Sequence, residues 1–119
     1  EYHIDDGCGL SKENQLSPKM ITALLAYMSK HPHGKVLWDS LPTSGIDGGL
    51  RRRMHTPKYK TKIHAKTGYI ARTSALSGYI DTTNGEVLAF SILMNNFQNL
   101  KVMQKIQDDI CQVMVDCYQ

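Results

Sequence analysis

The pattern of apolar and polar positions predicts helices in the first part of the chain and strands in the second. Residues 1–16 are rich in Asp, Gly, Ser and Asn without a sustained period, which is typical of an irregular loop. A helix is predicted to begin after Ser17, a favourable N-cap that is followed by Pro18. Its apolar residues recur at helical spacing: Met20, Ile21, Leu24, Leu25 and Met28. The sequence HPHG at residues 31–34 is expected to end it.

The next segment predicts short helices and turns rather than one long element. An apolar stretch at 36–41 precedes Pro42, and residues 46–54 are compatible with another short helix. Glycines at 45, 48 and 49 interrupt the region and favour turns.

From residue 61 the period changes to that of strands. The run 61–69 alternates, with Ile63, Ala65 and Thr67 on one face and Lys62, His64 and Lys66 on the other. Runs at 74–81 and 86–95 follow, and Asn84-Gly85 between them is a strong signal for a tight hairpin. The third run is apolar on both faces, which predicts cover on both sides of the sheet. We therefore expect one antiparallel sheet in chain order with Lys66 on the outer strand.

A final helix is predicted at about 99–117, where the apolar positions form one stripe that can cover a sheet face. The predicted fold class is α+β: a three-stranded antiparallel sheet, flanking helices and a C-terminal helix. A chain of 119 residues fits one domain, 1–119.

Composition narrows the possible functions. No apolar run approaches the roughly 20 residues that span a bilayer. The net charge of +3 includes a basic cluster at 51–64, but neither a helix-turn-helix spacing nor an aromatic stacking platform accompanies it, so nucleic acid is not an expected partner. Cys8, Cys111 and Cys117 lack both disulfide-framework and zinc-ligand spacing, so neither kind of site is indicated. We expect no metal and no cofactor.

The sharpest chemical feature is Lys66-Thr67-Gly68 at the end of the first predicted strand. An ammonium and a hydroxyl beside an edge strand can receive a carboxylate. Gly68 leaves room for a ligand backbone, and the N–H of Tyr69 can point at a developing oxyanion. On the tripeptide alone, an ordinary exposed edge strand explains these residues as well.

The chain resembles a known family along nearly its whole length. Lys66-Thr67-Gly68 is similar to the third motif of serine beta-lactamases and penicillin-binding proteins, whose other motifs are S-x-x-K and S-D-N. The stretch DGCGLS at 6–11 resembles the D-G-S-G-L-S stretch of the D-alanyl-D-alanine carboxypeptidase/endopeptidase family often called DacB, with Cys8 at the usual serine. The family's L-P-x-x-G-x-D-G-x-L-x-x-R stretch is resembled by Leu41-Pro42, Gly45, Asp47-Gly48 and Leu50-Arg51, and the likeness continues through LSGY at 76–79.

This resemblance implies a beta-lactamase/transpeptidase-like fold whose motif strand borders the catalytic cleft. It also implies that Lys66 and Thr67 hold the terminal carboxylate of a D-Ala-D-Ala stem peptide of peptidoglycan, or that of a beta-lactam. Tyr69 would give its main-chain N–H to the oxyanion hole. The expected location is the bacterial cell envelope, periplasmic or extracytoplasmic.

The departures from the family pattern are equally informative. None of the serines has Lys three residues on, and S-x-N is absent. In the family both motifs precede the D-G-S-G-L-S stretch, so we expect the chain to be the C-terminal part of a transpeptidase-like domain whose N-terminal remainder supplies the nucleophile. The alternative is a binding module on a similar scaffold without chemistry. Carboxypeptidase and endopeptidase activity stay open.

Three other residues invite functional interpretations that we weigh against simpler ones. Cys8 has His3 and acidic residues near it in sequence, but proximity is not triad geometry, and a replacement of serine in a turn is favoured. His64 is expected to be a surface side chain rather than a general base. Asp47 is expected to brace the glycine turn after it.

Overall fold

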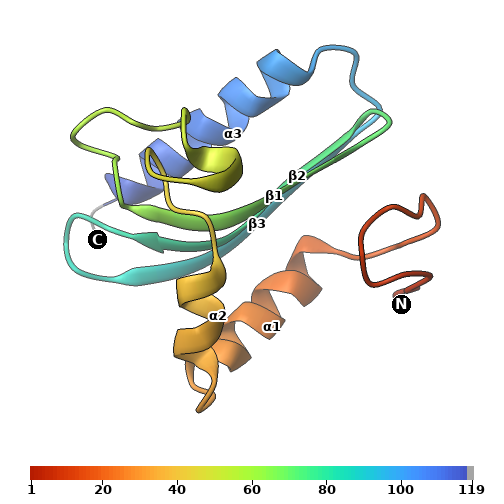
Figure 1. Cartoon of the computed structure of the whole chain (residues 1–119), viewed down its shortest axis with the longest axis horizontal. Helices are drawn as coiled ribbons and strands as arrows, with labels where there is room; N and C mark the ends of the chain where they lie inside the picture. Colours follow the sequence, from red (N-terminus) through yellow and green to blue (C-terminus); the bar gives the residue numbers. More distant parts are fainter. Residues whose placement is uncertain (118–119) are drawn as a thin grey trace.

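The computed structural model describes residues 1–117, which form an α+β fold (Figure 1). The elements in chain order are α1 (Pro18–Ser29), α2 (Gly34–Ser40), the single 3-10 turn η1 (Gly48–Leu50), β1 (Ile63–Ile70), β2 (Thr73–Asp81), β3 (Val87–Asn95) and α3 (Leu100–Val115). The predicted class is confirmed, and the predicted strands agree with the observed ones within two residues.

The three strands form one antiparallel sheet in the order β1-β2-β3, which confirms the predicted order and places β1 on the outside. Lys66 lies opposite Ser77, which lies opposite Ser91. The register is continuous along both pairs, so side chains alternate regularly between the two faces.

The sheet lies between two helical layers. In Figure 1, α3 covers one face, together with the connection between α2 and β1, and α1 and α2 lie against the other. The main core forms on the α3 side and contains Leu50, Met54, Ile63, Ala65, Leu76, Ile80, Phe90, Cys111 and Val115. The opposite side is tied to α1 by Tyr79, whose hydroxyl donates a 2.7 Å hydrogen bond to the carbonyl of Leu25.

The predicted helix starts are confirmed at atomic detail. The Ser17 hydroxyl accepts from the N–H of Met20, and the Asn99 side chain accepts from the N–H of Val102. These caps satisfy N–H groups that the first helical turn leaves without a partner.

One expected helix does not form as such. Of residues 46–54 only Gly48–Leu50 are helical, as one 3-10 turn. The backbone reverses here with positive φ angles of 52° at Gly48 and 49° at Met54, because Leu50 and Met54 must both reach the core. Tertiary burial overrides the local preference for a continuous helix.

The cover predicted for the third strand is partial. Phe90 is buried, but most of β3 is half-buried and Val87 is exposed. α1 packs on β3, whereas the contacts of α3 fall mainly on β2. In the described residues β3 is also an edge strand, because it is the last strand in the order β1-β2-β3.

Candidate active-site edge

The outer edge of β1 is covered over its first half only. The N–H of Ser44 donates to the carbonyl of Ile63 at 2.8 Å, and the N–H of Ala65 donates to the carbonyl of Pro42 at 2.9 Å. Within residues 1–117, segment 42–44 makes the only backbone hydrogen bonds to the outer edge of β1. The edge next to residues 67–69 is therefore open.

The same two hydrogen bonds show which backbone groups face outward. Ile63 and Ala65 direct their polar groups away from β2, whereas the carbonyl of Lys62 accepts from the β2 side. In a regular antiparallel ladder this direction alternates from residue to residue. The N–H groups of Thr67 and Tyr69 consequently point to the open edge.

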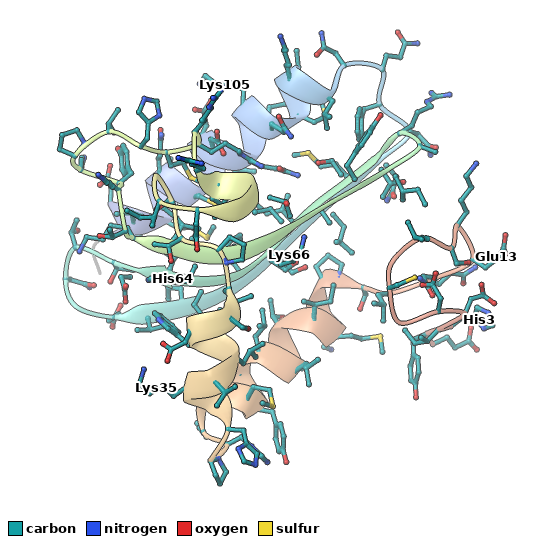
Figure 2. All side chains as sticks on the ribbon, in the orientation of Figure 1. His3, Glu13, Lys35, His64, Lys66 and Lys105 are labelled. Atoms are coloured by element: carbon teal, nitrogen blue, oxygen red, sulfur yellow. The ribbon has the colours of Figure 1, made fainter. Side chains whose placement is uncertain are left out.

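Lys66 brings its charge to the same edge. The residue is exposed, and its side chain leaves the sheet on the side of α1 (Figure 2). Its Nζ donates a 2.7 Å hydrogen bond to the carbonyl of Thr67, a group that points outward. The ammonium therefore lies at the strand edge and not over the middle of the sheet.

Thr67 reaches the edge from the opposite face, where Gly49 lies against it. A Cβ built on Gly49 would be 2.4 Å from Thr67 Oγ1. Only glycine leaves room for the threonine side chain in this position. The η1 turn thus positions the hydroxyl, while β1 positions the ammonium.

A hollow of about 520 Å³ begins at the two residues that follow Thr67 and extends over the α1 side of the sheet, where Ala75 of β2 and Leu93 of β3 also line it. Gly68 and Tyr69 line it from β1, and the loop before α1 contributes its opposite side through residues that include Ser11 and Asn14. A Cβ on Gly68 would meet no atom closer than 3.5 Å, an ordinary contact. Packing therefore does not demand glycine at this position, and its missing side chain leaves the hollow open.

The loop that lines the hollow is organised around Asp6. Its carboxylate accepts from the N–H groups of Gly9, Leu10 and Ser11 and from the Asn14 side-chain amide. The hydrogen bond from Asn14, assisted by those from Cys8, Ser11 and Gly9, lowers the pKa of Asp6 to about 2. An ionised Asp6 thus keeps this wall of the hollow in shape at neutral pH.

The structure corrects the interpretation of His64 as a surface side chain, because only 13% of its side chain is exposed. Its ring packs on Trp38 with centroids 4.4 Å apart. Nδ1 pairs with the Thr43 hydroxyl at 3.2 Å and Nε2 with Asp81 at 3.1 Å. Both ring nitrogens have partners within the fold, so this geometry favours a structural role over proton transfer.

Cys8 and Asp47 also belong to local structure. The Cys8 thiol donates to Asp6 at 3.3 Å, and that carboxylate is already occupied by the loop. The Asp47 carboxylate accepts from the N–H of Thr43 at 2.7 Å and makes no hydrogen bond to the η1 turn, so it braces the turn at 43–47 and not, as expected, the glycine turn that follows it.

Sequence reasoning missed the parts of the site that come from distant segments. It did not anticipate that Gly49 packs on Thr67 or that residues 42–44 cover part of the edge. It also did not assign Ser11 and Asn14 to the hollow. The glycines at 48 and 49 after Pro42 signalled a tight turn, but they do not indicate which residue the turn packs against.

Comparison with known proteins decides the family. The sequence profile of the D-Ala-D-Ala carboxypeptidase 3 (S13) family matches residues 1–116. The chain belongs to this family. It is 31% identical to the D-alanyl-D-alanine carboxypeptidase DacB of Haemophilus influenzae over 79% of this chain and 20% of that protein. It is 36% identical to the D-alanyl-D-alanine carboxypeptidase of an Actinomadura species over 77% of this chain and 18% of that protein.

Solved structures support the fold. The crystal structure of penicillin binding protein 4 (dacB) from Haemophilus influenzae superposes with a TM-score of 0.86 over 98% of this chain and 28% of that one, at 24% identity. A complex of that protein with a novel beta-lactam gives 0.77 over 88% of this chain and 27% of that one, at 26% identity. The S13 chain described here thus spans about a fifth of its curated relatives' length. No helix in residues 1–117 is both long and apolar enough to cross a membrane.

Proposed function

We propose that this chain forms the C-terminal wall of the active site in a single transpeptidase-like domain of a serine D-Ala-D-Ala carboxypeptidase. The complete enzyme would hydrolyse the terminal bond of peptidoglycan stem peptides through an acyl-enzyme and would be acylated by beta-lactams. Support comes from the S13 family match and from relatives that are named carboxypeptidases. The related penicillin binding protein 4 has been solved with a beta-lactam bound.

The observation that carries the proposal is the open edge of β1. There the Lys66 ammonium donates to the outward carbonyl of Thr67, and the next outward N–H belongs to Tyr69, which also lines the hollow of about 520 Å³. A substrate carboxylate would accept hydrogen bonds from Lys66 and from the Thr67 hydroxyl. The scissile carbonyl oxygen would receive the N–H of Tyr69, a fixed donor that stabilises negative charge as it develops.

A serine and its lysine base would come from the N-terminal remainder of the protein. This chain has no S-x-x-K and no S-x-N. We propose a location in the bacterial cell envelope, periplasmic or extracytoplasmic, because that is where the proposed substrate is. Whether the enzyme also acts as an endopeptidase depends on parts of the site that other segments supply.

The test uses a longer chain that also carries S-x-x-K and S-x-N. Lys66→Ala should slow acylation by ligands with a free carboxylate roughly ten- to a hundredfold, because a hydrogen bond to a charged group contributes about 1.5 to 3 kcal/mol. Amidated analogues should lose much less. Thr67→Val should act in the same direction with a smaller effect, because it removes the hydroxyl and keeps the shape.

Two results would contradict the proposal. Equal slowing of both ligand types by Lys66→Ala would move the lysine from carboxylate recognition to proton transfer or folding. A covalent penicillin adduct on the 119-residue chain alone, seen by intact-mass spectrometry, would show a nucleophile that we do not assign.

A further inference from the structure

A second hollow, of about 410 Å³, lies in the connection between η1 and β1. Four of its five lining residues carry side-chain N–H donors: Arg51, Arg52, His55 and Lys60. The fifth is Gly45, and no acidic residue takes part in the lining. This connection lies on the α3 side of the sheet (Figure 1), where Arg53 bonds to Asp108 of α3.

The donor side chains of the hollow form no ion pair among the described residues, although neighbouring basic residues do. Arg53 bonds to Asp108 at 2.7 Å, and Lys58 bonds to Asp116 at 2.7 Å. None of the four donor side chains of the hollow takes part in an ion pair within residues 1–117. All four residues are exposed. The charges of the two arginines and the lysine, and the donor groups of all four residues, are therefore available to a ligand.

The backbone that carries them is held by the core. Leu50 and Met54 are buried on either side of the arginines, with exposed fractions of 0% and 4%. Ser44 is fully buried, and its hydroxyl donates to the carbonyl of Tyr59 and accepts from the N–H of Ile63. Buried, hydrogen-bonded anchors of this kind fix the spacing of the outward side chains before any ligand arrives.

Gly45 allows the hollow to form. Its φ is +71°, and its N–H donates to the carbonyl of Leu50 at 2.9 Å. A Cβ at this position would lie 3.0 Å from Lys60 Cγ and 3.1 Å from His55 Cα. A larger residue would press on Lys60 and on the backbone of His55 and would narrow the hollow.

We propose that this hollow binds a single phosphate group. Two guanidinium groups present paired donors that match phosphate oxygens, and a lysine adds a compact charge. The doubly charged anion uses more of this donor set than one carboxylate does. None of the lining residues is Trp, Tyr or Phe, so the stacking surface that a nucleobase needs is missing. This inference does not depend on the proposed enzymatic function.

The test is titration of the 119-residue chain with inorganic phosphate at fixed ionic strength, followed by amide NMR shifts. Saturable shifts are expected at Gly45, Arg51 and Arg52. The double variant Arg51→Gln/Arg52→Gln should bind at least tenfold more weakly. Because both residues are exposed, the variant should stay folded, which its spectrum reports directly.

The matched control is Lys19→Gln/Lys30→Gln, which removes the same charge from exposed positions at α1, on the other side of the sheet. Its affinity should stay within about twofold, because exposed charges beyond a Debye length are largely screened. Arg51→Lys/Arg52→Lys keeps the charge but loses the paired donors, so it should fall between wild type and the glutamine variant. Equal weakening by both glutamine pairs would overturn the proposal, as would shifts that do not saturate.

Two further arms identify the source of the phosphate. Binding of the chain to vesicles of phosphatidylglycerol in phosphatidylcholine, if inorganic phosphate competes with it, would indicate a lipid headgroup. Binding of soluble glycerol phosphate without vesicle binding would indicate a soluble ester. Either result supports the site. If oligothymidylate outcompetes phosphate and its affinity rises with its length, the hollow is part of a nucleic-acid-binding surface and the proposal of a single-phosphate site is wrong.

Discussion

Two glycines on neighbouring strands should respond to the same mutation with opposite signs. A Cβ on Gly68 of β1 would lie 3.5 Å from the nearest atom, the Cβ of Ala75. A Cβ on Gly78 of β2 would lie 2.1 Å from the carbonyl oxygen of His64 and 2.6 Å from Ala65 Cα. The first position has space for a methyl group, whereas the second is closed by backbone of the next strand.

The magnitudes follow from these distances. Glycine inside a strand costs roughly 0.5 to 1 kcal/mol relative to alanine, so Gly68→Ala should raise the free energy of unfolding by about that amount. Gly78→Ala gains the same entropy but forces the backbone apart, and overpacking costs about 1 to 3 kcal/mol or more. We expect a net loss of roughly 1 to 2 kcal/mol, which corresponds to a melting temperature lower by about 4 to 10 °C.

Urea unfolding of the 119-residue chain measures both effects. Trp38 is the single tryptophan, and its ring stacks on Tyr79 with centroids 5.0 Å apart, so its fluorescence reports on the sheet beside Gly78. In a longer, active chain Gly68→Ala should weaken ligand binding despite its higher stability, because the methyl group enters the hollow. A Gly68→Ala variant that unfolds as easily as Gly78→Ala would show that Gly68 serves the fold, and our explanation of the hollow would fail.

Three further predictions concern other parts of the chain. Arg53→Met should lower the free energy of unfolding, measured by urea titration, by about 3 kcal/mol, because it leaves the 18% exposed Asp108 without its partner. Adding Asp108→Leu should restore most of this loss. The Asp6 loop should be stable above the ordinary carboxyl pKa of 3.8 and should open as the pH falls towards about 2, because a lowered pKa means that ionisation favours the folded loop. The amide NMR signal of Ser11 should report this opening, and Asp6→Asn should abolish it. Burial raises the pKa of the Cys111 thiol to about 12, so a thiol reagent should modify Cys111 only when the chain unfolds, whereas the two exposed cysteines should react at once. Rapid modification of all three would contradict the buried placement of Cys111.

The sequence predicted the elements whose signals are local. Strand alternation, the Asn84-Gly85 hairpin and the cap at Ser17 depend on residues within a few positions of each other. Such signals survive in any tertiary context that buries the apolar face. They were sufficient for the α+β class and for the strand order.

Features that depend on distant packing were not predicted. His64 alternates onto the polar face of its strand, yet Trp38 covers it, and no local rule specifies that contact. The stretch 46–54 has residues that suit a helix, but Leu50 and Met54 must both enter the core, and only a tight turn with positive φ angles allows this. In both cases burial against another element outweighs the local preference.

The location of the candidate site follows from the chain outside the motif. An edge strand offers outward N–H and C=O groups along its whole length, and these groups pair with any segment that approaches. Here Pro42 and Ser44 occupy the edge as far as Ala65. The first outward N–H beyond this cover belongs to Thr67 and the next to Tyr69. Segment 42–44 therefore determines where along β1 a ligand can meet free backbone donors, and the Lys66 ammonium lies at the point where that cover ends.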